Sequence, residues 1–285
     1  MKPLFYLISF LPKTFVSLSI DLFLATKVYK FLSNYKITKK NLEIAYPHRT
    51  DEDIKILSKL SFKEFLISGF ESIYTWGTSE SESNSNLLCV ENNFLLNNLK
   101  HSGLVAVSFH NRSVDMLLTW MNSQHTTVSL YKRIKNKTLD NFVKSKRESG
   151  MSKCFEINIA GVRHLYKAIK NKNIVCFAAD QVPKRGLGEH INFFNVEAYT
   201  TTLVQSLALK TKVPVVYFFI QTNQDRKLKI KIERCNDNIY DDSKHLLQIN
   251  SDIEKFINAR PSDYSWEYKR FKRSKNLPAD LYKNI

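Results

Sequence analysis

The sequence predicts an α/β protein with a mixed, mostly parallel sheet flanked by helices, and three patterns indicate this class. From residue 87 onward, short strand-like runs alternate with helical stretches. Some runs, such as Ile174–Ala179, are continuously apolar, which is typical of strands covered on both faces. A hydrophobic helical region precedes the alternating part. At 285 residues and 43% hydrophobic content, the chain suffices for one large domain or for a domain plus an appendage.

The N-terminus is the most apolar part of the chain. Leu4–Leu11 is apolar, Pro12-Lys13-Thr14 interrupts it, and Phe15–Ala25 is apolar apart from two serines and Asp21. The basic stretch that follows would hold this region on the cytoplasmic side. We predict an N-terminal hydrophobic helical membrane anchor over residues 1–36, either inserted or lying in the membrane plane, and a main domain over residues 37–285. A buried helical hairpin is the alternative.

The next elements are defined by capping and polarity. Thr50-x-x-Asp53 predicts a helix start, and a helical stripe of apolar residues follows it. Residues 78–86 are almost entirely polar and predict a surface loop, with a subdomain boundary as the alternative. The predicted strands are Leu104–Phe109, Thr126–Tyr131, Cys154–Asn158, Ile174–Ala179, Val213–Gln221 and Leu228–Arg234, and the predicted helices lie near residues 113–124, 138–149, 161–171, 200–211 and 243–259.

Charge and cysteine content limit the partners and the compartment. Basic residues outnumber acidic ones 43 to 27, giving a net charge of +16, which implies an acidic partner. Nucleic acid, an anionic membrane, a phosphorylated lipid and an acidic carrier protein all fit the charge. The four cysteines are scattered with no paired spacing, so we predict a reducing compartment, no disulfide framework and no metal site.

The most informative segment is Leu104–Asp115, where a strand-like run ends on His110 and Asp115 follows five residues later. On one continuous helix this spacing would turn the two side chains apart. They meet only if His110 lies in the turn before the helix and Asp115 in its first turn, with Ser113 as a plausible N-cap. The prediction is an imidazole oriented by a carboxylate at the end of a strand.

A second polar patch, residues 178–186, follows the predicted strand Ile174–Ala179. Asp180 is a natural site residue at that strand end. Lys184 and Arg185 would meet a phosphate or carboxylate. A solvated turn with incidental charge is the alternative.

These patches and several further blocks resemble the bacterial lipid A biosynthesis acyltransferases, of the lauroyl and myristoyl type. His110 to Asp115 matches the family's His-x4-Asp/Glu motif. Where members often have Gly-Asn-Trp inside that motif, this chain has Arg112-Ser113-Val114. The other similar blocks are Asn41–Pro47, Tyr131 to Gly150, Val175–Gln181, Phe193 to Ala208 and Trp266–Phe271.

The resemblance implies an enzyme that transfers an acyl chain from a thioester to a hydroxyl of a lipid A precursor. His110 and Asp115 would be the catalytic pair, with no cofactor. Arg147, Asp180 and Gln181 would lie in or beside the substrate pocket, and Arg112, Arg163, Lys184 and Arg185 would be further candidates for an anionic headgroup. The implied partners are an acyl carrier protein thioester or acyl-CoA, an anionic glycolipid acceptor and the membrane surface, at the cytoplasmic face of a bacterial inner membrane.

Two other functions compete with this interpretation. The same chemistry could act on a glycerophospholipid or another lipid acceptor, because glycerolipid acyltransferases share a similar histidine motif. Their usual Phe-Pro-Glu-Gly-Thr block is missing here. A non-enzymatic membrane or nucleic-acid binder would also use the charge of +16, but no recognised nucleic-acid motif supports it.

Overall fold

The computed structural model describes residues 2–223, 225 and 227–285. A seven-stranded sheet forms its centre, with strand order β1-β9-β8-β2-β5-β3-β4. Only the β8–β9 pair is antiparallel in this sheet, so the predicted mixed and mostly parallel α/β fold is confirmed. The strands are β1 (Leu87–Glu91), β2 (Leu104–Ser108), β3 (Thr127–Tyr131), β4 (Lys153–Glu156), β5 (Ile174–Ala178), β8 (Val215–Thr222) and β9 (Leu228–Arg234).

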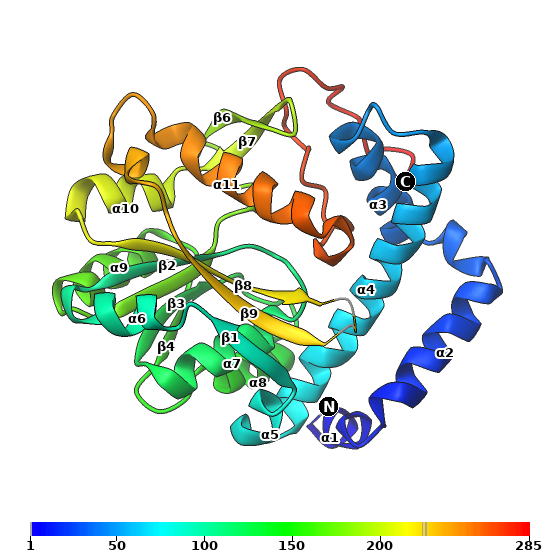
Figure 1. Cartoon of the computed structure of the whole chain (residues 1–285), viewed down its shortest axis with the longest axis horizontal. Coiled ribbons are helices and arrows are strands. Elements are labelled where there is room, and N and C mark those ends of the chain that lie inside the picture. Colours follow the sequence, from blue (N-terminus) through cyan, green and yellow to red (C-terminus); the bar gives the residue numbers. More distant parts are fainter. Residues whose placement is uncertain (1, 224, 226) are drawn as a thin grey trace.

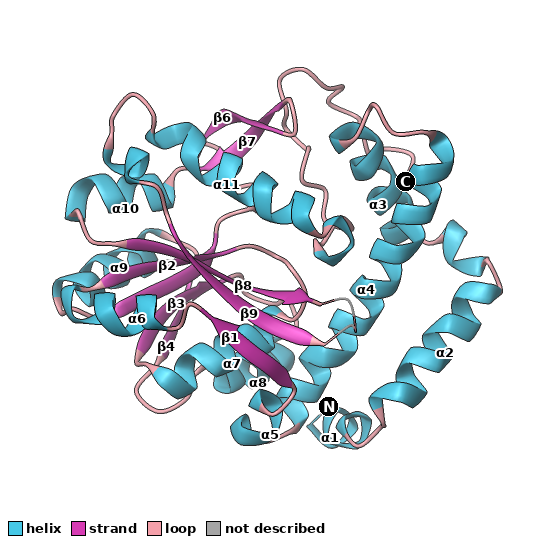
Figure 2. Cartoon of the chain, viewed as in Figure 1, coloured by secondary structure: helices cyan, strands magenta, loops and turns pink. Residues whose placement is uncertain are grey.

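Helices cover both faces of the sheet, as Figure 2 shows. Along β2, Val105 and Val107 point into one core with α9, α10 and α11, while Leu104 and Ala106 point into another with α6 and α7. This alternation is the period of two that a strand imposes. These helices are α6 (Phe94–Leu99), α7 (Val114–Gln124), α9 (Ile159–Lys170), α10 (Leu203–Thr211) and α11 (His245–Ala259), and α8 (Lys137–Arg147) joins β3 to β4.

One loop prediction is wrong, and the sequence does not predict the small second sheet. The polar stretch after residue 78 holds a short helix, α5 (Glu80–Asn84), because the Ser79 hydroxyl caps it by accepting from the Glu82 N–H. A two-stranded antiparallel hairpin, β6 (Gly188–Phe193) and β7 (Val196–Thr201), lies outside the main sheet. Its polar strands lack the apolar run of a central strand.

The N-terminal helices pack along one side of the domain (Figure 1). They are α1 (Lys2–Ser9), α2 (Lys13–Ala25), α3 (Ser33–Ala45) and the long α4 (Asp51–Gly77), with a 3-10 turn, η1 (Val28–Phe31), after α2. Thr50 caps α4 as predicted, accepting from the Asp53 N–H at 3.1 Å. Among the described residues, no helix has the length and apolar character needed to cross a membrane.

Candidate active site

His110 and Asp180 meet because they leave adjacent parallel strands at the same level. Ser108 at the end of β2 is in register with Ala178 at the end of β5. Two residues further on, each strand delivers one side chain to the carboxyl edge of the sheet, where α/β proteins bind ligands. The Nδ1 atom of His110 lies 2.8 Å from Oδ1 of Asp180. The His110 backbone N–H also donates to Oδ2 of the same carboxylate, at 3.2 Å.

The environment of this pair favours its charged form. Burial disfavours the imidazolium, but the charge of Asp180 and the hydrogen bond to it outweigh burial and raise the pKa of His110. Burial likewise opposes ionisation of Asp180, yet His110 holds the pKa of that carboxyl below its usual value. The Asp180 side chain is 2% exposed and that of His110 is 31% exposed. A ligand can therefore reach the imidazole but not the carboxylate behind it.

Gln181 contacts the other ring nitrogen. Its Nε2 lies 3.1 Å from Nε2 of His110. Both nitrogens of the ring thus face residues of the loop after β5. The expected closeness of Asp180 and Gln181 to His110 has a direct cause in the parallel register of the two strands.

Asp115 has a different partner from the one its spacing predicts. It lies in the first turn of α7, where its two carboxylate oxygens accept hydrogen bonds from Nε and Nη2 of Arg147 at 2.6 and 3.2 Å. Arg147 ends α8, and its charge is close enough to His110 to oppose protonation of the imidazole. The structure therefore replaces the predicted His110–Asp115 contact with two pairs, His110–Asp180 and Asp115–Arg147. Ser113 occupies the N-cap position of α7 without capping it.

The segment after η4 (Pro261–Asp263) closes the site. The Ser265 N–H donates to the His110 carbonyl oxygen at 2.9 Å, and the Tyr268 hydroxyl accepts from the Val182 N–H at 3.1 Å. The Tyr264 hydroxyl hydrogen bonds to Asp180. One stretch of chain thus ties together the two loops that carry the histidine and the carboxylate.

Glu267 in this segment is a site residue that the sequence did not single out. Burial raises its pKa to about 7, while His110 opposes the rise and Asp180 adds to it. The pKa of Glu267 is thus close to neutral pH, and its carboxyl group interacts electrostatically with the imidazole of His110. A single glutamate in a run of aromatic and basic residues gives no signal of this kind in the sequence.

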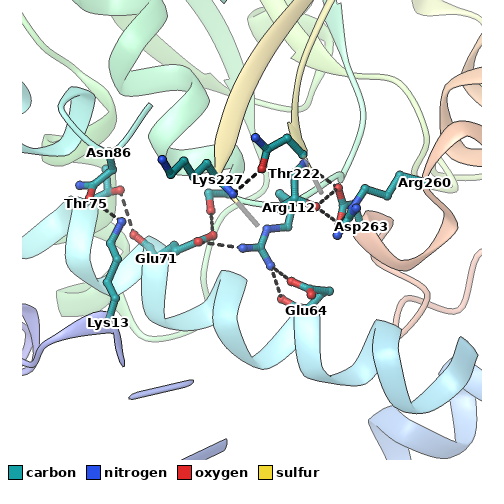
Figure 3. A network of polar contacts seen from close by, with 12 residues as sticks. Lys13, Glu64, Glu71, Thr75, Asn86, Arg112, Thr222, Lys227, Arg260 and Asp263 are labelled. Carbon is teal, nitrogen blue, oxygen red and sulfur yellow. Dashed lines mark hydrogen bonds and ion pairs between the residues drawn. The ribbon is translucent and has the colours of Figure 1, made fainter. Parts of the chain in front are cut away.

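Arg112 is held inside the protein and does not line the site. Figure 3 shows its guanidinium between Glu64 and Glu71, both from α4. Nη2 lies 2.9 Å from Oε1 of Glu71, and Nη1 pairs with Glu64. The Ser113 hydroxyl donates to the other oxygen of Glu71. Arg112 is only 4% exposed, so our expectation of a substrate-binding cation at this position is corrected.

Comparison with protein families assigns the chain to a family. The model of the bacterial lipid A biosynthesis acyltransferase family matches residues 4–273. The chain belongs to this family of acyltransferases. In a search of curated proteins, no protein matched it significantly.

The backbone of the buried Arg112 has an unusual conformation. Its φ of 53° lies in the left-handed region. Glycine adopts that backbone conformation without steric cost, whereas a residue with a side chain pays a cost because of its Cβ atom. A hydrogen bond to a distant segment holds the backbone of Arg112 in place, because its N–H donates to the Asp263 carbonyl oxygen at 2.9 Å.

Two distant blocks of the acyltransferase pattern lie together in space. Asn41 of α3 donates through Nδ2 to the carbonyl oxygens of Trp266 and Tyr268, at 2.6 and 2.7 Å. Asn41 therefore holds the segment that closes the site. Arg270 is also buried and donates to the Tyr199 carbonyl oxygen and the Thr200 hydroxyl of β7.

The remaining predicted cations lie on the surface. Lys184 and Arg185 are exposed in the loop between β5 and β6, and Arg163 is exposed on α9. Their role in binding an acyltransferase substrate remains a prediction. A cavity of about 600 Å³ lies between α1, the end of α4 and α8; its lining includes Tyr6, Trp76, Phe142 and Lys146.

Proposed function

We propose that this acyltransferase moves a fatty acyl chain from an acyl carrier protein thioester to a hydroxyl of a lipid A precursor. The family supports the acyl transfer and the lipid A pathway in general. The observation that carries the chemical proposal is the accessible His110 backed by the buried Asp180. This is the arrangement that a general base requires, because the carboxylate fixes the ring and favours its protonation.

In the proposed reaction, Nε2 of His110 takes the proton of the acceptor hydroxyl while the oxygen attacks the thioester carbonyl carbon. The hydroxyl would take the place that the Gln181 amide occupies, 3.1 Å from Nε2. The new C–O bond forms, the C–S bond breaks, and the imidazolium returns the proton to the departing thiolate. General base catalysis of this kind typically contributes ~10²–10⁴-fold.

Other residues have proposed roles in binding. Arg147, held by Asp115, would present a cation to a phosphate of either substrate. Lys184, Arg185 and Arg163 would extend this positive surface toward the headgroup. The cavity beside α8 would receive an apolar chain, because aromatic side chains line it. Helix α8, which forms one of its walls, ends at Arg147, so the cavity lies near the proposed phosphate-binding cation.

We place the enzyme at the cytoplasmic face of a bacterial inner membrane. A net charge of +16 favours both an acidic carrier protein and an anionic leaflet. The division into an N-terminal membrane-binding part, residues 1–36, and an acyltransferase domain, residues 37–285, belongs to the same proposal.

The test uses the purified full chain with labelled acyl carrier protein thioester and a detergent-dispersed lipid A precursor. We expect acyl transfer by the wild type and by His48→Ala, an exposed control, and at least ~10²-fold slower transfer by His110→Ala. Transfer that survives in His110→Ala would reject the proposed base. Transfer to a glycerophospholipid but not to the lipid A precursor would reject the acceptor.

A further inference from the structure

Helix α4 directs two acidic side chains into the interior of the protein. Glu64 and Glu71 are seven residues apart, which is about two helical turns, so they lie on one side of the helix. Their exposed fractions are only 5 and 4%. Both contact the guanidinium of Arg112 (Figure 3). Burying a carboxylate costs free energy unless it is paired and hydrogen bonded, so these two acids depend on the segment that they hold.

Glu71 holds two consecutive residues of that segment. Its Oε1 lies 2.9 Å from Nη2 of Arg112, and its Oε2 accepts a hydrogen bond from the hydroxyl of Ser113. Ser113 is fully buried and occupies the N-cap position of α7, where its side chain makes no capping bond. A negative charge at the start of a helix is favourable. The carboxylate of Glu71 therefore links α4 to the beginning of α7.

The two residues that Glu71 holds lie between the charged groups of the candidate site. His110, which contacts Asp180, precedes them by two residues, and Asp115, which contacts Arg147, follows Ser113 by two. The segment is short, so a shift of residues 112 and 113 would move the groups on both sides. The bond from Ser113 to Glu71 thus bears on the position of His110.

Other contacts hold the same segment from the side of the sheet. Nδ2 of Asn111 donates to the carbonyl oxygen of Ile220 at 2.7 Å, and the N–H of Arg112 donates to the carbonyl oxygen of Asp263 at 2.9 Å. These contacts fix residues 111 and 112, which lie next to His110. Glu71 fixes the segment from α4, at residues 112 and 113. The turn is therefore clamped between α4 and the sheet.

The charges around Glu71 allow it to be replaced without leaving a buried charge unpaired. If Glu71 becomes neutral, Arg112 still has Glu64 as its partner. The second cation is Lys13, the first residue of α2, whose ammonium interacts with the charge of Glu71 and donates to Asn86 (Figure 3). Lys13 is an exposed residue, so its ammonium can turn to solvent. Substitution of Glu71 therefore tests mainly the loss of its two contacts.

We propose that Glu71 is a positioning residue for acyl transfer. Through Arg112 and Ser113 it holds the turn that carries His110, so that the imidazole keeps its contact with Asp180. The inference rests on the proposed function, because it takes His110 as the base. Glu71 is buried behind the turn and acts only through it. Misplacement of a reacting group by about 1 Å can slow a reaction ~10²-fold, which is why a distant contact affects the rate.

The first experiment measures acyl transfer by the full chain in detergent, below the onset of thermal unfolding. Glu71→Leu should lower kcat by ~10–10²-fold and change KM by less than about threefold. Glu71→Gln keeps hydrogen-bonding groups for Arg112 and Ser113 and should retain most of the rate. The matched control is Glu64→Leu, which removes the other acid of Arg112 and should lower the melting temperature similarly but slow transfer much less. Equal losses of kcat in Glu71→Leu and Glu64→Leu would overturn the proposal.

A smaller change isolates the contact with α7. Ser113→Ala removes the hydrogen bond to Glu71 and leaves both ion pairs of Arg112 in place. We expect it to lower kcat roughly tenfold, and Glu71→Leu should add little to that loss, because the two residues act together. Unchanged transfer by Ser113→Ala would overturn the proposal. Glu52→Gln, which changes an exposed acid of α4, should transfer as the wild type.

Two further measurements separate positioning from simple destabilisation. In the His110→Ala background, Glu71→Leu should cause no further loss, because no base remains to be positioned. A purely structural residue would slow both backgrounds by the same factor, and that result would overturn the proposal. The second measurement is the pH profile of kcat/KM. Its acidic limb should move to lower pH in Glu71→Leu, because a weakened contact with Asp180 lowers the pKa of His110; Glu267 and Arg147 are the other charged groups that act on this imidazole.

The same variants distinguish failure of this inference from failure of the proposed function. Transfer by His110→Ala at the rate of the wild type would reject His110 as the base and, with it, the proposed function. Loss of transfer in His110→Ala without loss in Glu71→Leu would keep the base and reject only the role of Glu71.

Discussion

The central residue of the site is His110, and its behaviour depends on which carboxylate supports it. Asp180 holds Nδ1 and the backbone N–H of His110, while Asp115 holds Arg147. A carboxylate beside an imidazole raises its pKa, whereas one neutralised by an arginine does so much less. The two aspartates are therefore distinguishable by pH dependence.

We predict that Asp180→Asn moves the acidic limb of the pH profile of kcat/KM to lower pH and lowers the maximum ~10²–10⁴-fold. The base must be neutral, so activity of the wild type rises as pH passes the raised pKa of His110. Without Asp180 that pKa falls, and the limb falls with it. Asp115→Asn should shift the limb less. A larger shift for Asp115→Asn would favour the pair predicted from the His-x4-Asp spacing.

Glu267 gives a prediction on stability. Its pKa is about 7 in the folded protein against an ordinary value of 4.5. The folded state therefore keeps a proton that the unfolded chain releases, so this residue lowers stability as pH rises from about 4.5 to about 7. Glu267→Gln removes the effect, and we expect a gain of about 1–3 kcal/mol at pH 8 and little change at pH 4. Urea unfolding at both pH values measures it, with exposed Glu189→Gln as control. An equal change at both pH values would contradict the raised pKa.

Among single residues, the sequence singles out His110, Asp180, Gln181 and Arg147 as candidates, and the last three lie close to His110 in the structure, but the sequence does not show how they pair. Spacing along the chain links His110 to Asp115. The actual partner comes from register between β2 and β5, seventy residues apart, which no single segment encodes. Arg112 is misread for a related reason: nothing local shows that a cation will be buried between two acids of a distant helix.

At the scale of elements, α4 connects the N-terminal helices to the turn that carries His110. One part of it packs on α2 through Phe62, and Glu64 and Glu71 hold Arg112 (Figure 3). The strands of the main sheet are largely predictable from their apolar runs. The edge strand β1 and the hairpin β6–β7 are not, because half or more of their side chains are exposed or polar.

We predict that Arg112→Gly destabilises the protein by about 3–5 kcal/mol, although glycine suits the left-handed φ of 53°. The loss comes from leaving the Glu64 and Glu71 carboxylates buried without their cation. Arg133→Gly removes an arginine that is 58% exposed and paired at 3.5 Å and beyond, and should cost about 1 kcal/mol or less beyond the backbone effect of glycine.

The compensated variant separates charge from backbone. Glu64→Gln/Glu71→Gln/Arg112→Gly removes all three charges together, and we expect it to recover most of the lost thermal stability. Thermal unfolding of the single and triple variants measures this recovery. A triple variant no more stable than Arg112→Gly would show that packing, and not the buried charges, is what Arg112 supplies.

For the whole molecule, the sheet lies between the helices of its two faces and α4 borders it on one side. Helix α2 lies on the outer side of α4, and the sheet lies on its inner side (Figure 1). The four free cysteines can be used to measure whether the sheet opens. They lie on β1, β4 and β5 and directly after β9.

We predict that the native chain shows one fast thiol and three protected ones. Cys89 is exposed, whereas Cys154, Cys176 and Cys235 are buried. Burial raises the pKa of the Cys176 and Cys235 thiols to about 12, so almost no thiolate is present near neutral pH. Reaction then requires opening of the sheet, and the buried thiols should react at least ~10³-fold more slowly than in denaturant. Thiol titration of the wild type and of Cys89→Ser measures this. Cys154 on the edge strand β4 should be the first of the three to react, because fewer neighbours must separate to expose it; simultaneous reaction of all three would instead indicate that the sheet opens as one cooperative unit.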